Sequence, residues 1–193
     1  MNNRSLSSAK LLLAAIFVFS PGVPLGTARG EEPEKTKPAQ GSVQSALKNL
    51  RLPDLDGQMV DLGASLGKGP LLIDFWATWC KPCQAALPRL SKLYVDLHPR
   101  GLQMFGINED TPRSVSQVKP FIKSHGFQFP VVLDLNHDAQ TRLNVIGMPA
   151  TLLVDSSGKV VYTLFVYTPG ETEKLREQIE PLLGGKPEEK RHE

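Results

Sequence analysis

The order of apolar and polar residues predicts a buried strand followed at once by an amphipathic helix. Leu71–Trp76 is an apolar run interrupted by a single aspartate, and it is too short to form a helix, so it predicts a fully buried strand. After Cys80 the apolar residues recur at helical spacing as far as about Leu97, which predicts a helix starting at Lys81. Pro88 lies inside this helix and is expected to kink it.

The rest of the pattern continues the alternation of strands and helices. Before the buried strand, two short apolar segments flank Asp56-Gly57 and predict an N-terminal hairpin over Leu50–Leu62. A Ser156-Ser157-Gly158 turn is predicted to join the last two strands. Pro120 is expected to bend or split the helix that contains it. The other predicted strands are Leu102–Ile107, Phe127–Leu133, Thr151–Val154 and Lys159–Val166. Three more helices are predicted: one starts at Thr111-Pro112, and the other two span His137–Leu143 and Glu171–Leu183. This order predicts an α/β domain.

The N-terminus is typical of a secretory signal peptide. Residues 1–30 hold Arg4 and Lys10, then the apolar run Leu11–Phe19, and they end in Ala28-Arg29-Gly30, so cleavage is expected after Gly30. The apolar run is shorter than the roughly 20 residues that span a bilayer, and an uncleaved membrane anchor is the alternative. The protein is therefore expected to be exported to the periplasm or another extracytoplasmic space, free or anchored.

Composition divides the remainder into three parts. Residues 31–46 are charged and rich in proline, which predicts a flexible linker; residues 47–183 form the domain, and residues 184–193 form a disordered polar tail. Hydrophobic residues make up 40% of the chain, enough for the core of one domain.

Charge excludes two classes of partner. The chain has a formal net charge of +2, but the first thirty residues contain three basic side chains and no acidic ones, which leaves 19 basic and 20 acidic residues beyond them. A nearly neutral domain offers no basic surface for nucleic acid and no polybasic patch for a membrane. We expect a monomer.

The chemistry is expected at the only two cysteines, Cys80 and Cys83. A Cys-X-X-Cys pair where a strand passes into a helix is typical of a thiol–disulfide redox site. A zinc site would need two more ligands, and the sequence has no second cysteine pair and no His-X-His cluster. A purely structural disulfide across so short a loop would contribute only about 2 kcal/mol, against nearly 5 for a long loop. No metal or other cofactor is expected.

The helix start explains how the pair would react. Unpaired N–H groups and the positive end of the helix dipole stabilise a thiolate, so a pKa of about 8.5 commonly falls to roughly 3.5–7.5 at such a position. Cys80 is predicted to be the nucleophile, and Lys81 adds a nearby cation. Cys83 is one turn away and would resolve the mixed disulfide. Pro82 fits the first turn, where its missing N–H leaves no hydrogen bond unmade, and it stiffens the motif.

Three segments resemble one protein family. LLIDFWATWCKPC (Leu71–Cys83) is similar to the active-site segment of thioredoxins and of the TlpA/ResA-like branch of extracytoplasmic thiol–disulfide oxidoreductases. Gly106–Asp134 resembles the central insertion of that branch, and Val145–Val161 resembles its cis-proline loop and terminal hairpin. The resemblance implies a thioredoxin-like fold, with a central mixed sheet flanked by helices, an N-terminal hairpin and a TlpA-type central insertion.

The resemblance also assigns a role to Asp74, the aspartate within the buried strand. Thioredoxins have an aspartate there that accepts a proton from the second cysteine, so Asp74 is expected to deprotonate Cys83. The alternative is an Asp74 that faces solvent at a strand edge. The TlpA/ResA-like branch usually has a glutamate three residues after the second cysteine, where this chain has Ala86. We infer that Asp74 takes over that role; the alternative is slower proton transfer through water.

Substrate binding is expected around Met148-Pro149. By the resemblance this bond is cis, and Met148 supplies main-chain hydrogen bonds to an extended substrate segment, as in strand addition. Trp79 is expected to line the same surface, whereas Trp76 is expected in the core.

The other polar residues considered are given ordinary roles. Glu109-Asp110 is expected to assist the start of the next helix, because acidic residues are favoured near helix N-termini. His98, His125 and His137 are expected to be surface residues rather than ligands.

The resemblance favours a protein-disulfide reductase. It implies substrates among envelope proteins, apocytochrome c included, and re-reduction by a membrane electron donor. A disulfide oxidase or isomerase is an alternative, since a low Cys80 pKa makes the site more oxidising. A peroxiredoxin-like peroxidase would need Thr or Ser where Ala77 lies, and a copper-binding carrier would add a distant histidine to the two cysteines.

Overall fold

The computed structural model describes residues 42–168 and 170–184, and these lie within one compact unit, Thr36–Glu193. The predicted signal peptide, residues 31–41 of the predicted linker and residues 185–193 of the predicted tail lie outside the described residues. No helix within the described ranges is both long and apolar enough to cross a bilayer.

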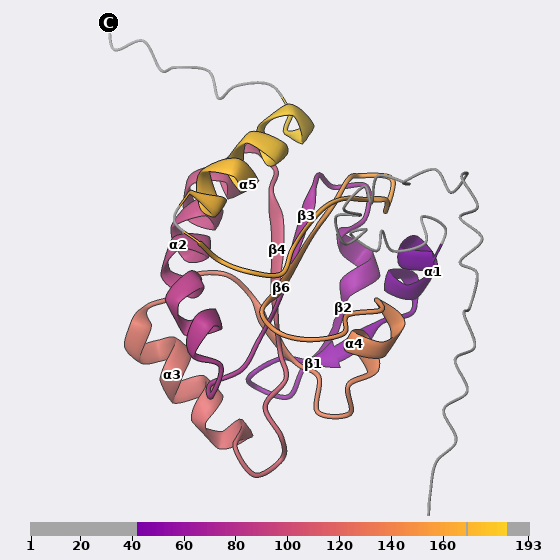
Figure 1. The fold of residues 1–193 in the computed structure, drawn as a ribbon. Coiled ribbons are helices and arrows are strands. Elements are labelled where there is room, and N and C mark those ends of the chain that lie inside the picture. Colours follow the sequence, from indigo (N-terminus) through magenta and orange to yellow (C-terminus); the bar gives the residue numbers. More distant parts are fainter. Residues whose placement is uncertain (1–41, 169, 185–193) are drawn as a thin grey trace, which may run out of the picture. The chain divides into compact units, whose positions relative to one another are not determined.

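A five-stranded mixed sheet forms the centre of the domain, with the order β5-β4-β3-β6-β7 (Figure 1). The strand β3 pairs in parallel with β4 and antiparallel with β6. All six residues of β3 are buried, as expected for a central strand covered on both faces. The strands are β3 (Leu71–Trp76), β4 (Gln103–Asn108), β5 (Val131–Leu133), β6 (Ala150–Val154) and β7 (Val160–Leu164).

Helices cover both faces of this sheet (Figure 1). One face carries α2 (Lys81–Leu97), α3 (Val118–His125) and α5 (Glu171–Ile179). The other carries α1 (Ser42–Lys48), α4 (Asp138–Arg142) and an antiparallel pair, β1 (Arg51–Pro53) and β2 (Met59–Asp61). The predicted α/β architecture and N-terminal hairpin are thereby confirmed.

The alternation of side chains along β3 divides the core into two clusters. Ile73 and Phe75 belong to one, together with residues of α1 and α4, and we call it the α1 cluster. Leu72 and Trp76 belong to the other, which contains Cys80 and Cys83 and which we call the cysteine cluster. Because successive strand residues point to opposite faces, Asp74 lies on the face of the cysteine cluster.

Three predicted boundaries are wrong, and one of them is that of β5, which starts at Val131 and not at Phe127. The predicted linker, residues 31–46, overlaps α1, whose Val43 and Leu47 are buried because they pack against the sheet. The helix predicted to start at Thr111 begins later, with a 3₁₀ turn at Val115–Gln117 and α3 from Val118. Pro120 therefore lies in the first turn of α3, where a missing N–H leaves no helix hydrogen bond unmade. The change from the 3₁₀ turn to the α-helix comes before Pro120, so this proline does not split α3.

Candidate active site

The two cysteines lie where β3 passes into α2, as predicted. Cys80 is the N-cap residue of α2, and the two cysteines form a disulfide with their Cα atoms 5.3 Å apart. The backbone N–H of Cys83 donates to Cys80 Sγ at 3.3 Å. Cys80 is 6% exposed and Cys83 only 1%. The N-terminal cysteine is therefore the more accessible one, and its sulfur already accepts an N–H of the first turn.

The neighbours of Cys80 include two exposed side chains. Trp79 is 58% exposed, as expected for a residue at an interaction surface, whereas Trp76 is fully buried. Lys81 is exposed, and its Nζ donates to Gln84 Oε1 at 3.5 Å. Pro82 lies in the first turn of α2. The effects predicted for Lys81 and Pro82 on the thiols remain predictions.

The loop between β3 and Cys80 is tied to the end of β4. Asp110 accepts hydrogen bonds from the backbone N–H of Thr78 at 2.7 Å and from Thr78 Oγ1 at 2.6 Å. Asn108 Nδ2 also donates to Asp110, at 2.9 Å. Burial opposes ionisation of Asp110, but these donors hold its pKa below the usual value. The Asp110 carboxylate thus fixes the loop that carries the active site. A hydrogen bond with Ser114, just before the 3₁₀ turn at Val115–Gln117, also lowers its pKa, so the expectation that Asp110 assists the next helix stays a prediction.

Asp74 is buried in the middle of the sheet, with 2% of its surface exposed. The alternative of an exposed aspartate at a strand edge is therefore wrong. It lies opposite Thr151 of β6, whose hydroxyl donates to Asp74 Oδ1 at 2.6 Å. Burial raises the pKa of Asp74 to about 7, and the Thr151 hydrogen bond opposes the increase. A carboxyl group with this pKa can accept and release a proton near neutral pH.

Sequence reasoning missed two hydroxyl side chains around Asp74. The Thr151 hydroxyl oxygen lies 2.6 Å from Asp74 and 2.6 Å from the Tyr167 hydroxyl. The sequence predicts Thr151 only as a strand residue, and Tyr167 follows β7 in a segment with no regular pattern. The available signal was the aspartate itself, because a buried carboxylate requires hydrogen-bond donors.

The Met148-Pro149 peptide bond is cis, as the resemblance predicted. Met148 is partly buried and packs against the cysteine cluster as well as the α1 cluster. The loop before β6 therefore contacts the core around the disulfide. Binding of a substrate backbone at Met148 remains a prediction.

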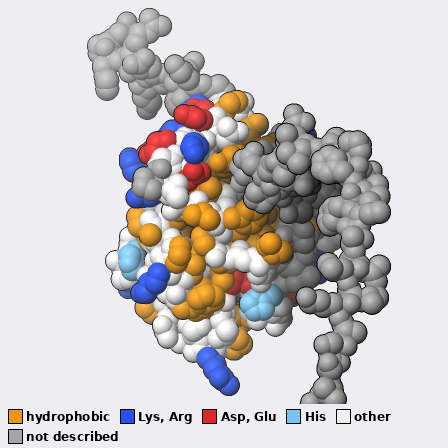
Figure 2. Space-filling model, viewed as in Figure 1, with side chains coloured by type: hydrophobic (Ala, Val, Ile, Leu, Met, Phe, Trp, Pro, Cys, Tyr) orange, Lys and Arg blue, Asp and Glu red, His pale blue; other side chains and the backbone are white. Residues whose placement is uncertain are grey.

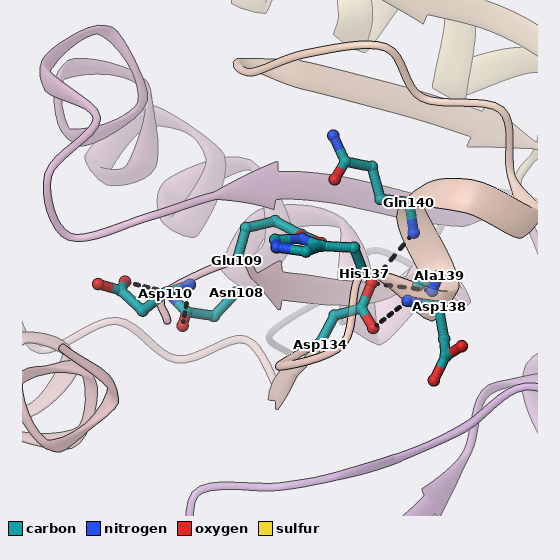
Figure 3. Close-up of polar contacts among 8 residues, drawn as sticks. All are labelled: Asn108, Glu109, Asp110, Asp134, His137, Asp138, Ala139 and Gln140. Carbon is teal, nitrogen blue, oxygen red and sulfur yellow. Dashed lines mark hydrogen bonds and ion pairs between the residues drawn. The ribbon is translucent and has the colours of Figure 1, made fainter. Parts of the chain in front are cut away.

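A second polar cluster lies at the ends of β4 and β5 (Figure 3). Glu109 contacts His137 Nδ1 through Oε2, while Glu109 Oε1 is buried without a hydrogen-bond partner in the described part of the chain. Burial raises the pKa of Glu109 to about 7, with His137 opposing and Asp134 adding to the shift. Asp134 accepts the backbone N–H groups of Asp138, Ala139 and Gln140. Glu109 thus pairs with His137 and does not assist a helix start.

Among the described residues, His98 and His125 are exposed, as expected. His98 and His125 each place Nδ1 2.9 Å from a backbone carbonyl oxygen. His137 is also largely exposed, but it contacts Glu109. Across residues 42–168 and 170–184, no three His, Cys, Asp or Glu side chains are arranged to hold a metal ion.

Comparison with known proteins finds relatives that are thiol–disulfide oxidoreductases. Residues 43–163 match the AhpC/TSA family. The chain is 30% identical to thiol-disulfide oxidoreductase ResA from Bacillus thuringiensis subsp. konkukian over 77% of this chain and 80% of the relative. It is 32% identical to ResA from Geobacillus kaustophilus over 77% of this chain and 82% of the relative.

A solved structure extends the comparison to the fold. The thioredoxin domain of a thiol-disulfide oxidoreductase from Bacteroides vulgatus aligns with a TM-score of 0.61 and 26% identity, covering 73% of this chain and 98% of that domain. The predicted thioredoxin-like fold is confirmed.

Proposed function

The chain belongs to the AhpC/TSA family and is a thiol–disulfide oxidoreductase of the ResA type, and from this premise we propose that it is exported and reduces disulfides in envelope proteins, apocytochrome c among them. The observation that carries the proposal is the Cys80–Cys83 pair at the start of α2, with an N–H already directed at Cys80 Sγ. Export is supported by the signal-peptide pattern of residues 1–30.

The reaction begins with the reduced protein. The Cys80 thiolate attacks one sulfur of the substrate disulfide, forming a Cys80–substrate bond while the other substrate sulfur leaves and takes up a proton. The N–H of Cys83 stabilises the attacking anion, since hydrogen bonds to the charged form of a group favour that form. The greater exposure of Cys80 allows the substrate to reach it first.

Resolution requires a second thiolate. Asp74 accepts the Cys83 proton, and Cys83 then attacks Cys80 Sγ, so that the second substrate sulfur leaves and the Cys80–Cys83 disulfide forms. Two electrons pass to the substrate, and a membrane electron donor restores the dithiol. Asp74 suits this role because it lies on the face of the cysteine cluster with a pKa of about 7. Ala86 is buried and supplies no carboxylate.

Substrate contact is assigned to the surface around the disulfide. Trp79 is exposed immediately before Cys80, and Met148 precedes the cis Pro149 beside the same cluster. In the view of Figure 2, hydrophobic side chains gather over the middle of the molecule, whereas charged side chains gather over α5. An extended substrate segment would pair with the Met148 backbone and pack on Trp79.

Trapping tests the proposal. In the Cys83→Ser variant, Cys80 can attack a substrate but cannot be released, so we expect mixed disulfides with envelope proteins that disappear on reduction and are identified by mass spectrometry. The Cys80→Ser variant is the matched control and should trap none of these proteins. Recovery of no partner in the native envelope, or a reduction potential of the wild type above roughly −150 mV, would contradict the reductase role.

A further inference from the structure

Three side chains from separate segments form one hydrogen-bonded chain on the face of the cysteine cluster. Tyr167 follows β7, Thr151 lies on β6 and Asp74 lies on β3. Both oxygen–oxygen distances are 2.6 Å, close to the usual separation for hydroxyl hydrogen bonds. Asp74 and Thr151 are almost completely buried, and Tyr167 is partly buried against the same cluster.

The chemistry of a hydroxyl group gives this chain a direction. The Thr151 hydroxyl has one hydrogen, and Asp74 Oδ1 accepts it. Thr151 Oγ1 can therefore only accept in its contact with Tyr167, so the Tyr167 hydroxyl must donate. Two donors in series thus end at the Asp74 carboxylate, and hydrogen bonds in such a series polarise and strengthen one another.

We propose that Tyr167 is a positioning residue for thiol exchange, acting through Thr151 to favour the ionised, proton-accepting form of Asp74. The proposal rests on the proposed function, in which Asp74 accepts the proton of Cys83. Tyr167 would not contact the reacting sulfurs, and its effect would reach them only through Asp74.

The surroundings keep Tyr167 able to donate. Burial, with the neighbouring Asp74 carboxylate, raises the pKa of Tyr167, so its hydroxyl keeps its hydrogen at neutral pH. The other ionisable groups that act on Tyr167 are Tyr162 on β7 and Glu171 at the start of α5. Glu171 also contacts Lys174, so its charge is partly balanced.

The test measures the Asp74 pKa directly in the full-length oxidised protein, by carbon-13 NMR of its carboxyl carbon between about pH 4 and 9. The Tyr167→Phe variant keeps the ring and removes the donor, and we expect its Asp74 pKa to rise by about 0.5–1 unit. Thr151→Val removes the direct hydrogen bond and should raise it by about 1–2 units. Thr151→Ser keeps the hydroxyl group, so its Asp74 pKa should equal that of the wild type.

The matched control is Tyr162→Phe, because Tyr162 interacts with Glu171 and has no hydrogen bond to Thr151. It should leave the Asp74 pKa unchanged. An unchanged Asp74 pKa in Tyr167→Phe, or an equal rise in Tyr162→Phe, would overturn the proposal. The NMR titration reports on the carboxyl group itself, so this result does not depend on catalysis.

A kinetic measurement separates this inference from the proposed function. Below the Asp74 pKa, each unit of increase lowers the ionised fraction about tenfold, so Tyr167→Phe should slow oxidation of the reduced protein by glutathione disulfide in stopped flow. The effect of Tyr167→Phe should vanish in an Asp74→Asn background. If it persists there, Tyr167 does not act through Asp74. If Asp74→Asn alone leaves the pH profile unchanged, the proton-acceptor role in the proposed function fails.

Discussion

Three buried carboxyl groups, one within β3 and two directly after β4, ionise differently because their partners differ. Asp110 receives two hydrogen bonds from Thr78 and one from Asn108, and its pKa is lowered despite burial. Asp74 has a single hydroxyl donor, and Glu109 has one oxygen without a partner among the described residues. Burial therefore prevails in both, and raises each pKa to about 7.

The raised pKa of Glu109 predicts how stability depends on pH. An unfolded glutamate titrates near about 4.3, so between that pH and about 7 the folded protein holds a proton that the unfolded chain has lost. The free energy of unfolding should therefore fall as pH rises through this window. Glu109→Gln should reduce the fall by about 1–2 kcal/mol in urea titrations at several pH values.

Asp138→Asn supplies the control for this titration. Asp138 is an exposed acid next to His137, so its replacement should leave the pH dependence as in the wild type. An identical decline in wild type and Glu109→Gln would show that Glu109 is not protonated in the folded protein at low pH.

At the scale of elements, the segment between β3 and α2 depends on contacts from both sides. Asp110, after β4, binds the backbone and side chain of Thr78, while Gln84 of α2 donates to the Thr78 carbonyl oxygen. The backbone N–H of Glu109 also donates to the Trp76 carbonyl oxygen at 2.9 Å. The position of Cys80 is therefore set by neighbouring elements as well as by α2.

Removing the Asp110 carboxylate should loosen this segment. Asp110→Ala leaves the partly buried Thr78 N–H without its acceptor, so we expect a loss of about 1–3 kcal/mol in unfolding free energy. Exchange of the Thr78 amide hydrogen and the rate of disulfide reduction should report the loosening. Asp155→Ala is a matched control, since Asp155 accepts N–H groups from an exposed hairpin turn, and it should cost within about 1 kcal/mol. Equal losses in the two variants would argue against a special role for Asp110.

At the scale of the whole molecule, the sheet requires cover on both faces. The face with α2, α3 and α5 holds the disulfide, and the opposite face is covered by α1, α4 and the β1–β2 pair. Val43, Leu47 and Leu50 join the core residues of β3 and β6 in the α1 cluster. Residues 42–46, which the sequence assigns to a linker, are consequently part of the domain together with the rest of α1.

A large-to-small substitution in α1 tests this conclusion. Leu47 is fully buried, and Leu47→Ala should lower the unfolding free energy by about 2–5 kcal/mol, because it removes buried methyl groups and leaves a cavity. Ser45→Ala changes an exposed position of the same helix and should stay within about 0.5 kcal/mol. Denaturant titration followed by circular dichroism measures both. A Leu47→Ala variant as stable as Ser45→Ala would mean that α1 does not contribute to the core.

The sequence by itself determined the order of strands and helices and the place of the reactive pair. Leu71–Trp76 is apolar enough to specify a buried strand, and the change to helical spacing after Cys80 locates the helix start, since both signals are local. The likeness of Val145–Val161 to known redox proteins also identified the cis Pro149.

Only the tertiary structure decided the partners of the buried polar groups and the contribution of α1. Thr151 and Asp74 are 77 positions apart, and Thr78 and Asp110 are 32 apart. Such pairs depend on strand register and loop packing, which periodicity along the chain does not encode. For the same reason Tyr167 carries no signal until the fold places its hydroxyl beside Thr151. The sequence assigns residues 42–46 of α1 to the linker because the few apolar residues of this helix become buried only against the sheet.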